Sequence, residues 1–151
     1  MSAYAKQMQK IVTEYRLAGE PWPASSKQIA AWAISTGRWE LPESAAIKQC
    51  AEDVSRAMRE EYFTDPKGRR VRLKHPVSRT HDGRQLVLWD DLRTAPREHM
   101  LLSFQQRRQQ IFGDCRQLKR DVDCYNDSHS DEPIIQIVFN FIRDLEEDEA
   151  A

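Results

Sequence analysis

The feature that most constrains the fold of this chain is the stretch of residues 67–89, KGRRVRLKHPVSRTHDGRQLVLW. Cationic and apolar residues alternate from Arg70 to Lys74, which is the two-residue period of a half-buried strand. Residues 85–89 form a second β-favouring run. The segment between the two runs carries the turn-favouring residues Ser78, Asp82 and Gly83. The stretch therefore predicts a β-hairpin with one face in the core and a row of positive charge on the other.

Positive charge is concentrated in this hairpin. Residues 67–84 contain seven Lys or Arg and one acidic residue, a net charge of +6, whereas the whole chain carries −1. Two interpretations are open: the cations contact nucleic-acid phosphates, or they keep an exposed edge strand from pairing with other sheets. The charge exceeds what edge protection requires, so we expect contact with nucleic acid. Double-stranded DNA is favoured over RNA because basic and aromatic residues do not interleave in the RNA-recognition pattern.

Three amphipathic helices are predicted before the hairpin. Apolar residues at helical spacing indicate a first helix over residues 4–17, which Gly19 ends. Ser25 and Gln28 form a capping-box pattern at the start of a second helix. Pro42 fits the first turn of a third helix. The apolar stripe of that third helix contains Ile47, Cys50, Val54, Ala57 and Met58, and Tyr62 and Phe63 follow it.

The order of three helices and a basic hairpin resembles the layout of the winged helix-turn-helix superfamily, over residues 4–90. In that superfamily the third helix commonly enters the DNA major groove, and the wing contacts the backbone or the minor groove. The resemblance implies that the following residues contact DNA: Lys48, Gln49, Ser55, Arg56, Arg59, Arg70, Arg72 and Arg79. The remaining hairpin cations expected at phosphates are Lys67, Arg69, Lys74 and Arg84.

Three carboxylates leave a second interpretation open. Glu43, Glu52 and Asp53 lie on or beside the expected reading face of the third helix, where they would repel phosphate. The alternative is a winged-helix protein-interaction or scaffold module that does not bind DNA and docks a partner protein through this helix. A third possibility is a regulator that senses a small molecule in an apolar pocket, although no polar constellation for a ligand is apparent.

A seven-residue repeat predicts a long helix over residues 96–125. Apolar residues recur there at spacings of three and four, interrupted by Arg108, as in a coiled-coil seam. Such a helix would be about 45 Å long, more than a winged-helix module could cover by itself. Five cations of this helix could extend the positive surface, but we expect them at exposed coiled-coil positions: Arg107, Arg108, Arg116, Lys119 and Arg120.

The C-terminal part predicts an antiparallel helical hairpin. A polar loop at residues 126–133 would connect the long helix to a final helix at 134–145 with a broad apolar face. Two such hairpins could pair in a homodimer. Its expected interface contains Leu101, Phe104, Ile111, Cys115, Leu118, Val122, Ile135, Phe139 and Ile142. The sequence thus predicts a mainly α, α+β chain with a winged-helix-like domain at 1–93, a dimerising hairpin at 94–147 and a frayed acidic tail at 148–151.

The chemistry of the remaining residues indicates no enzyme. No nucleophile, phosphate-loop or metalloprotease motif is present, and the Cys115, Cys124 and His129 spacing matches no known zinc site. We therefore predict no catalytic residue, no cofactor and no metal. The odd number of cysteines indicates free thiols, and no segment resembles a signal peptide or a membrane span, so we expect a cytoplasmic protein. The predicted function is DNA binding by a dimeric winged-helix regulator of transcription, replication or mobile-element maintenance.

Overall fold

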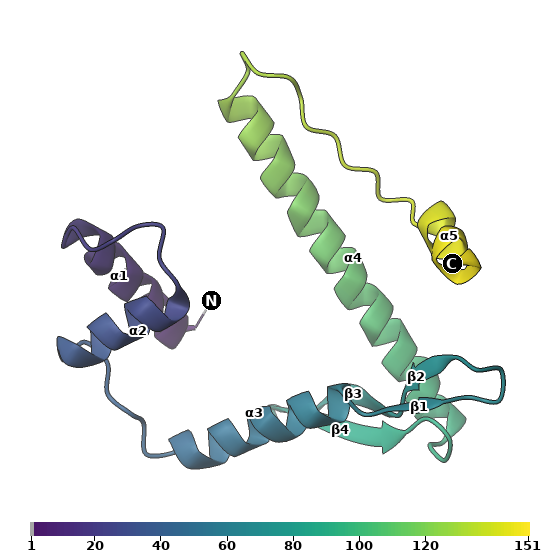
Figure 1. Ribbon diagram of the computed structural model, residues 1–151. Helices are drawn as coiled ribbons and strands as arrows, with labels where there is room; N and C mark the ends of the chain where they lie inside the picture. Colours follow the sequence, from purple (N-terminus) through teal and green to yellow (C-terminus); the bar gives the residue numbers. More distant parts are fainter. Residues whose placement is uncertain (1) are drawn as a thin grey trace. The chain divides into compact units, whose positions relative to one another are not determined.

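The structure is a computed structural model that describes residues 2–151 (Figure 1). Its elements are α1 (Ala3–Leu17), α2 (Ser26–Ser35), α3 (Ala45–Arg59), β1 (Tyr62–Thr64), β2 (Arg70–Arg72), β3 (Lys74–His81), β4 (Arg84–Asp91), α4 (Arg97–Ser128) and α5 (Ile142–Ala150). The predicted fold class, mainly α with a small β component, is confirmed. The chain divides into two compact units, residues up to Val54 and Ser55–Ala151, which we describe separately.

The first unit is built on the packing of α1 against α2. Its buried residues are Ile11 and Tyr15 of α1 and Ala33 of α2. The ring of Tyr15 packs edge-on against Trp32 with centroids 5.5 Å apart, and its hydroxyl donates a hydrogen bond to the carbonyl oxygen of Pro21 at 2.9 Å. The ring of Tyr15 therefore packs in this small core, and its hydroxyl bonds the segment that connects α1 to α2.

The start of α2 confirms the predicted capping box. The backbone N–H of Gln28 donates to the Ser25 hydroxyl oxygen at 3.1 Å, and the Ser25 N–H donates to the Gln28 side-chain oxygen at 2.8 Å. Two N–H groups that would lack partners within the helix are thereby satisfied. The α2 helix ends before Gly37, whose φ of +71° lies in the left-handed region that favours glycine.

The second unit contains two β-hairpins where one was predicted. The alternating basic segment is divided at Leu73, so that β2 pairs with β1 and β3 pairs with β4. The prediction missed β1: Tyr62 and Phe63 were noted only as residues that follow the third helix, and they lie in a strand after α3 has ended at Arg59. Their side chains favour β structure, and β1 pairs with β2 across the turn at residues 65–68.

The turn of the β3–β4 hairpin contains only Asp82 and Gly83. Their φ angles are +49° and +72°, as in the type I′ turn that suits the twist of paired strands. His81 therefore lies opposite Arg84. Ser78, which was expected in the turn, lies within β3.

The core of the second unit lies where α4 packs against β3. Leu73, His75 and Val77 are buried on the strand side, and Ser103 is buried on the helix side. Among these residues Val77 is fully buried, with 0% of its surface exposed. The predicted long helix is confirmed and extends to Ser128, so the expected polar loop begins later than predicted.

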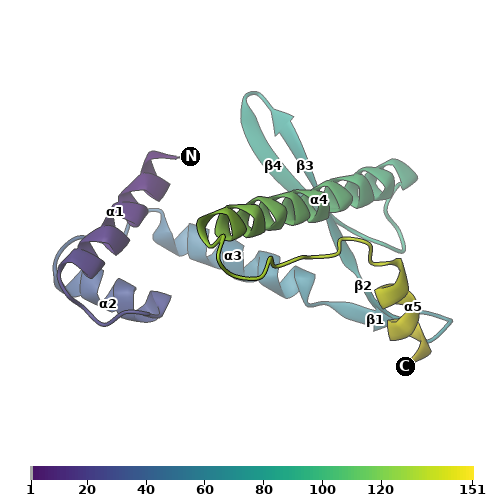
Figure 2. The ribbon, with the colours of Figure 1, turned by 90° about the horizontal axis from the view of Figure 1, so that it is seen from above.

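The C-terminal segment corrects the prediction of a helical hairpin. Residues 134–140 run extended without belonging to a helix or strand (Figure 1), and Phe141 caps the next helix with φ −100° and ψ 7°. Helix α5 covers only Ile142–Ala150, including part of the tail that was predicted to be frayed. The extended segment runs back along α4 (Figure 1, Figure 2). It is rich in β-branched and aromatic residues, which lose side-chain freedom in a helix, whereas the residues after Ile142 are mostly good helix formers.

Candidate nucleic-acid interface

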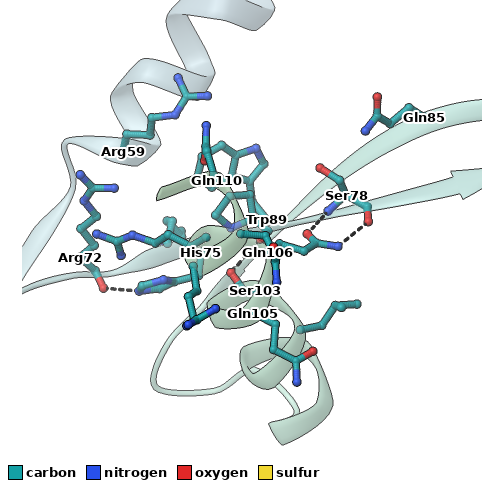
Figure 3. Close-up of a pocket in the computed structure, with 16 residues that line it drawn as sticks. Arg59, Arg72, His75, Ser78, Gln85, Trp89, Ser103, Gln105, Gln106 and Gln110 are labelled. Carbon is teal, nitrogen blue, oxygen red and sulfur yellow. Dashed lines mark hydrogen bonds between the residues drawn. The ribbon is translucent and has the colours of Figure 1, made fainter. Parts of the chain in front are cut away.

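A groove of about 1170 Å³ opens beside the packed core of the second unit (Figure 3). The ends of α3 and β2, the strands β3 and β4 and the first half of α4 all contribute to its wall. Its cationic lining residues are Arg59, Arg72, Lys74, Arg107 and Arg108. Among the residues that the structure describes, no aspartate or glutamate lines it. The groove is therefore a concave surface of one charge sign, which raises the local concentration of anions.

Three of the groove cations lie at the ends of secondary-structure elements. Arg59 is the last residue of α3, and its guanidinium lies 5.7 Å from the centroid of the Trp89 ring. Arg72 is the last residue of β2. The Lys74 ammonium lies 3.4 Å from a Glu61 carboxylate oxygen and 4.0 Å from one of Asp91, so its charge is partly balanced beside the groove.

A row of polar side chains on α4 fixes the wall by bonding to the backbone of β3. The Gln106 amide donates to the Ser78 carbonyl oxygen at 2.9 Å, and its oxygen accepts from the Ser78 N–H at 2.8 Å. The Ser103 hydroxyl donates to the Pro76 carbonyl oxygen at 2.7 Å (Figure 3). A nitrogen of the His99 ring lies 2.9 Å from the His75 carbonyl oxygen. These bonds hold α4 in register with β3, and Arg107 and Arg108 follow directly after Gln106.

No family model, curated protein or solved structure matches this chain. The interpretation of the groove therefore depends on its own geometry and chemistry.

The histidine beneath the groove is held in its neutral form. His75 is 4% exposed, and a nitrogen of its ring lies 2.8 Å from the carbonyl oxygen of Arg72. Burial lowers the pKa of His75 below its ordinary value, and the charges of Arg107 and Arg72 lower this pKa further, although the bond to the Arg72 carbonyl acts in the opposite direction. A neutral ring donates this bond through its N–H.

The depressed pKa of His75 predicts that the folded state loses stability as the pH falls. The unfolded chain takes up a proton near the ordinary histidine pKa, whereas the folded chain resists protonation until a lower pH. The free energy of unfolding should therefore decrease between about pH 7.5 and 5.5, and His75→Gln should decrease less over this range. Urea denaturation at both pH values measures the difference. His81→Gln, at the exposed end of β3, is the control: it removes a histidine whose ring nitrogen lies 3.3 Å from an Asp82 carboxylate oxygen, and it should change the dependence less than His75→Gln does.

The structure brings three of the predicted DNA-contacting residues together in the groove: Arg59, Arg72 and Lys74. Arg79 and Arg84 are exposed towards the turn end of the β3–β4 hairpin. In the other hairpin, Arg69 is paired with Asp65 at 2.7 Å and the Lys67 N–H donates to the same carboxylate. The Arg70 guanidinium lies 4.2 Å from the Tyr62 ring centroid. None of these last three residues lines the groove.

The predicted residues of the third helix fall into both compact units. Lys48 and Gln49 belong to the first unit, where the Lys48 ammonium lies 5.5 Å from the Tyr4 ring centroid and the Gln49 amide donates to Asp53 at 3.0 Å. Ser55 and Arg56 belong to the second unit and do not line its groove.

Sequence reasoning missed the contribution of α4 to the groove. Arg107 and Arg108 were expected to be merely exposed coiled-coil positions, and the lining glutamines were not considered: Gln85, Gln105, Gln106, Gln109 and Gln110. The available signal was the run QQRRQQ at 105–110, which places six polar residues in succession on a helix otherwise marked by an apolar repeat. Trp89 was identified only as the end of a strand.

The apolar seam predicted on α4 is largely open to solvent. Leu101, Phe104, Ile111 and Leu118 are exposed, and Cys115 and Val122 are half-buried. Phe104 contacts its own chain, because its ring packs edge-on against His75 with centroids 5.6 Å apart. On the C-terminal segment, Ile135 and Ile142 are exposed and Phe139 is half-buried. Their role in a dimer interface stays a prediction.

The described residues offer neither a metal site nor a membrane-spanning helix. Within residues 2–151, no group of three or more His, Cys, Asp or Glu side chains is placed to hold a metal ion. None of the helices described has both the length and the apolar character needed to cross a bilayer. Cys50, Cys115 and Cys124 are free thiols in the structure.

Proposed function

We propose that this protein binds double-stranded DNA and that the groove of the second unit is where the sugar-phosphate backbone binds. The observation that carries the proposal is the lining of five cationic residues from three regions of the chain, with no acidic residue in the described lining. Phosphate contacts dominate the affinity of proteins for DNA, and arginine matches phosphate with two parallel donors. Four of the five cations are arginines.

The glutamines in the groove support a second step after electrostatic capture. A glutamine amide can form a donor-acceptor pair with the major-groove edge of adenine. Gln85, Gln105, Gln109 and Gln110 line the groove, while Gln106 is engaged with β3. We therefore infer that phosphate contacts by the arginines position the DNA, and that these amides supply base contacts. A regulator of transcription, replication or mobile-element maintenance is the class of protein that this arrangement fits.

The test is the salt dependence of binding to a labelled duplex of random sequence, followed by fluorescence anisotropy. If five cations contact phosphates, the affinity should fall roughly 500-fold between about 50 and 200 mM salt, because each contact contributes about −0.9 to the logarithmic slope. A slope near zero, or no binding at the lower salt, would contradict the proposal. Single-stranded DNA of the same length serves as the comparison for duplex preference.

A second candidate function is the binding of a partner protein through α3. This helix has no buried residue, and Ile47 and Val54 on its apolar stripe are exposed. The acidic residues Glu43, Glu52 and Asp53 lie close by in the sequence and would favour a basic partner over DNA. Absence of duplex binding at low salt would favour this candidate.

A further inference from the structure

The segment at residues 134–141, extended up to Asn140, has the composition of a strand but belongs to no sheet. Its sequence, IIQIVFNF, has no charged residue and is rich in β-branched and aromatic side chains. Residues 134–140 make no backbone-to-backbone hydrogen bond within the part of the chain that the structure describes. An extended backbone with open donors and acceptors is a template for pairing with another strand.

Side-chain exposure along this segment alternates as it does in a strand that covers a core. Ile135, Ile137 and Phe141 are 47%, 43% and 45% exposed, whereas Ile134 and Val138 are 72% and 76% exposed. The odd-numbered residues therefore form the more covered face. This face includes Phe139 and Phe141, which line a cavity of about 480 Å³ together with Ile111, Phe112 and Cys115 of α4. The cover over α4 is incomplete, because a packed interior would leave no space of that size.

One edge of the segment is already occupied. The Asn126 amide donates to the Ile135 carbonyl oxygen at 2.9 Å, and its oxygen accepts from the Ile135 N–H at 3.0 Å. In an extended chain, the backbone groups of successive residues point to opposite edges. Paired as a strand, the segment would therefore present the backbone groups of Ile134, Gln136, Val138 and Asn140 at the edge that Asn126 does not occupy.

We propose that this edge pairs with residues 134–141 of a second copy of the chain in an antiparallel two-stranded sheet. A two-fold axis at Ile137 or Val138 places odd-numbered residues opposite odd-numbered residues, so all the apolar side chains of the covered face stay on one side. That side also faces the exposed seam of α4 in each copy. The second copy therefore supplies the missing cover for α4.

Charge distinguishes antiparallel from parallel pairing. Helix α5 follows the segment directly and carries one arginine against five carboxylates. A parallel pair would place two such acidic helices side by side, whereas an antiparallel pair places them at opposite ends of the sheet. Like charges at close range cost free energy, so the antiparallel arrangement is favoured.

The exposed area of the chain leaves room for such an interface. Two separate compact domains with the sizes of the two units would together expose about 9,500 Å². The chain exposes 12893 Å². The surplus of about 3,400 Å² per chain is ample for a dimer, because stable interfaces commonly bury roughly 1,200–2,000 Å² in total and obligate ones more.

The proposal is tested by removing backbone N–H groups from the open edge. Sedimentation equilibrium of the DNA-free protein from about 1 to 100 μM should show a monomer-dimer equilibrium. Val138→Pro and Gln136→Pro each delete one N–H per chain at that edge and should each raise the dissociation constant roughly tenfold or more. Val138→Thr keeps both the N–H and the branched shape and should dimerise as the wild type does.

Circular dichroism of the monomeric proline variants checks that they fold. Their helical signal should match that of the wild type, because the segment makes no backbone bond that proline would remove from a single chain. Amide exchange at Gln136 and Val138 should slow as the protein concentration rises. A wild type that stays monomeric, a dimer that both proline variants preserve, or an assembly larger than a dimer would overturn the proposal.

Discussion

Arg107→Glu combined with Arg108→Glu is expected to lower the affinity for duplex DNA about a hundredfold or more. Both arginines line the groove from α4, and both are exposed at its surface. Each lost hydrogen bond to a charged phosphate is worth about 1.5 kcal/mol or more, and two of them multiply to this ratio. The salt slope should also fall by about two units, because two phosphate contacts are removed. Fluorescence anisotropy at several salt concentrations measures both quantities.

Arg97→Glu combined with Arg120→Glu is the matched control for this variant. Both residues are exposed on the same helix, and the change in net charge is the same, but neither residue lines the groove. The control should weaken DNA binding only through the long-range electrostatic potential of the whole protein, which salt screens. If the two variants lose equal affinity for duplex DNA, the result would contradict a localised phosphate site. It would indicate that net charge alone attracts the DNA.

Val77→Asp should give the largest loss of stability among single substitutions in the second unit. Val77 is completely buried at the contact between β3 and α4, and an aspartate there would place a carboxylate among groups that cannot solvate it. The expected cost is at least about 3 kcal/mol, a large share of the stability of a domain of this size. Urea denaturation followed by circular dichroism gives the change in the free energy of unfolding.

The control for this substitution lies on the partner strand. Val87 of β4 is exposed and faces Ser78 in the register of the hairpin, so Val87→Asp introduces the same side chain in the same sheet without burying it. Its cost should stay near 1 kcal/mol, which is the span of strand propensity. If both variants lose the same stability, the contact between α4 and β3 does not form the core of this unit.

The first four helices and the position of the hairpin turn could be predicted because their determinants are local. The Ser25 and Gln28 pair fixes the start of α2, and Asp82 with Gly83 fixes a two-residue turn. The seven-residue repeat identified α4 because its period persists over many turns. One error came from an apolar run whose period is ambiguous. Residues 134–141 were predicted to be helical, but their β-branched and aromatic side chains disfavour a helix, and the segment forms none.

The groove was only partly predictable because long-range contacts assemble it. The alternating cations identified Arg72 and Lys74, and the expected reading helix identified Arg59. The other wall depends on Gln106 and Ser103, which bond to β3 across a separation of nearly thirty residues. No local sequence pattern shows that the Gln106 side chain will form the backbone hydrogen bonds that a neighbouring strand would otherwise form with β3. For that reason the arginines next to Gln106 could not be assigned to the groove.

The bonds between Gln106 and Ser78 also leave the two edges of the β3–β4 sheet unequal. A carboxamide presents the same donor and acceptor as a peptide group, so at Ser78 it satisfies the outer side of β3 as a further strand would. Within residues 2–151, β4 pairs only with β3, and its Leu86 and Leu88 side chains are exposed. A further strand that extends this sheet is therefore expected to pair with β4 and not with β3.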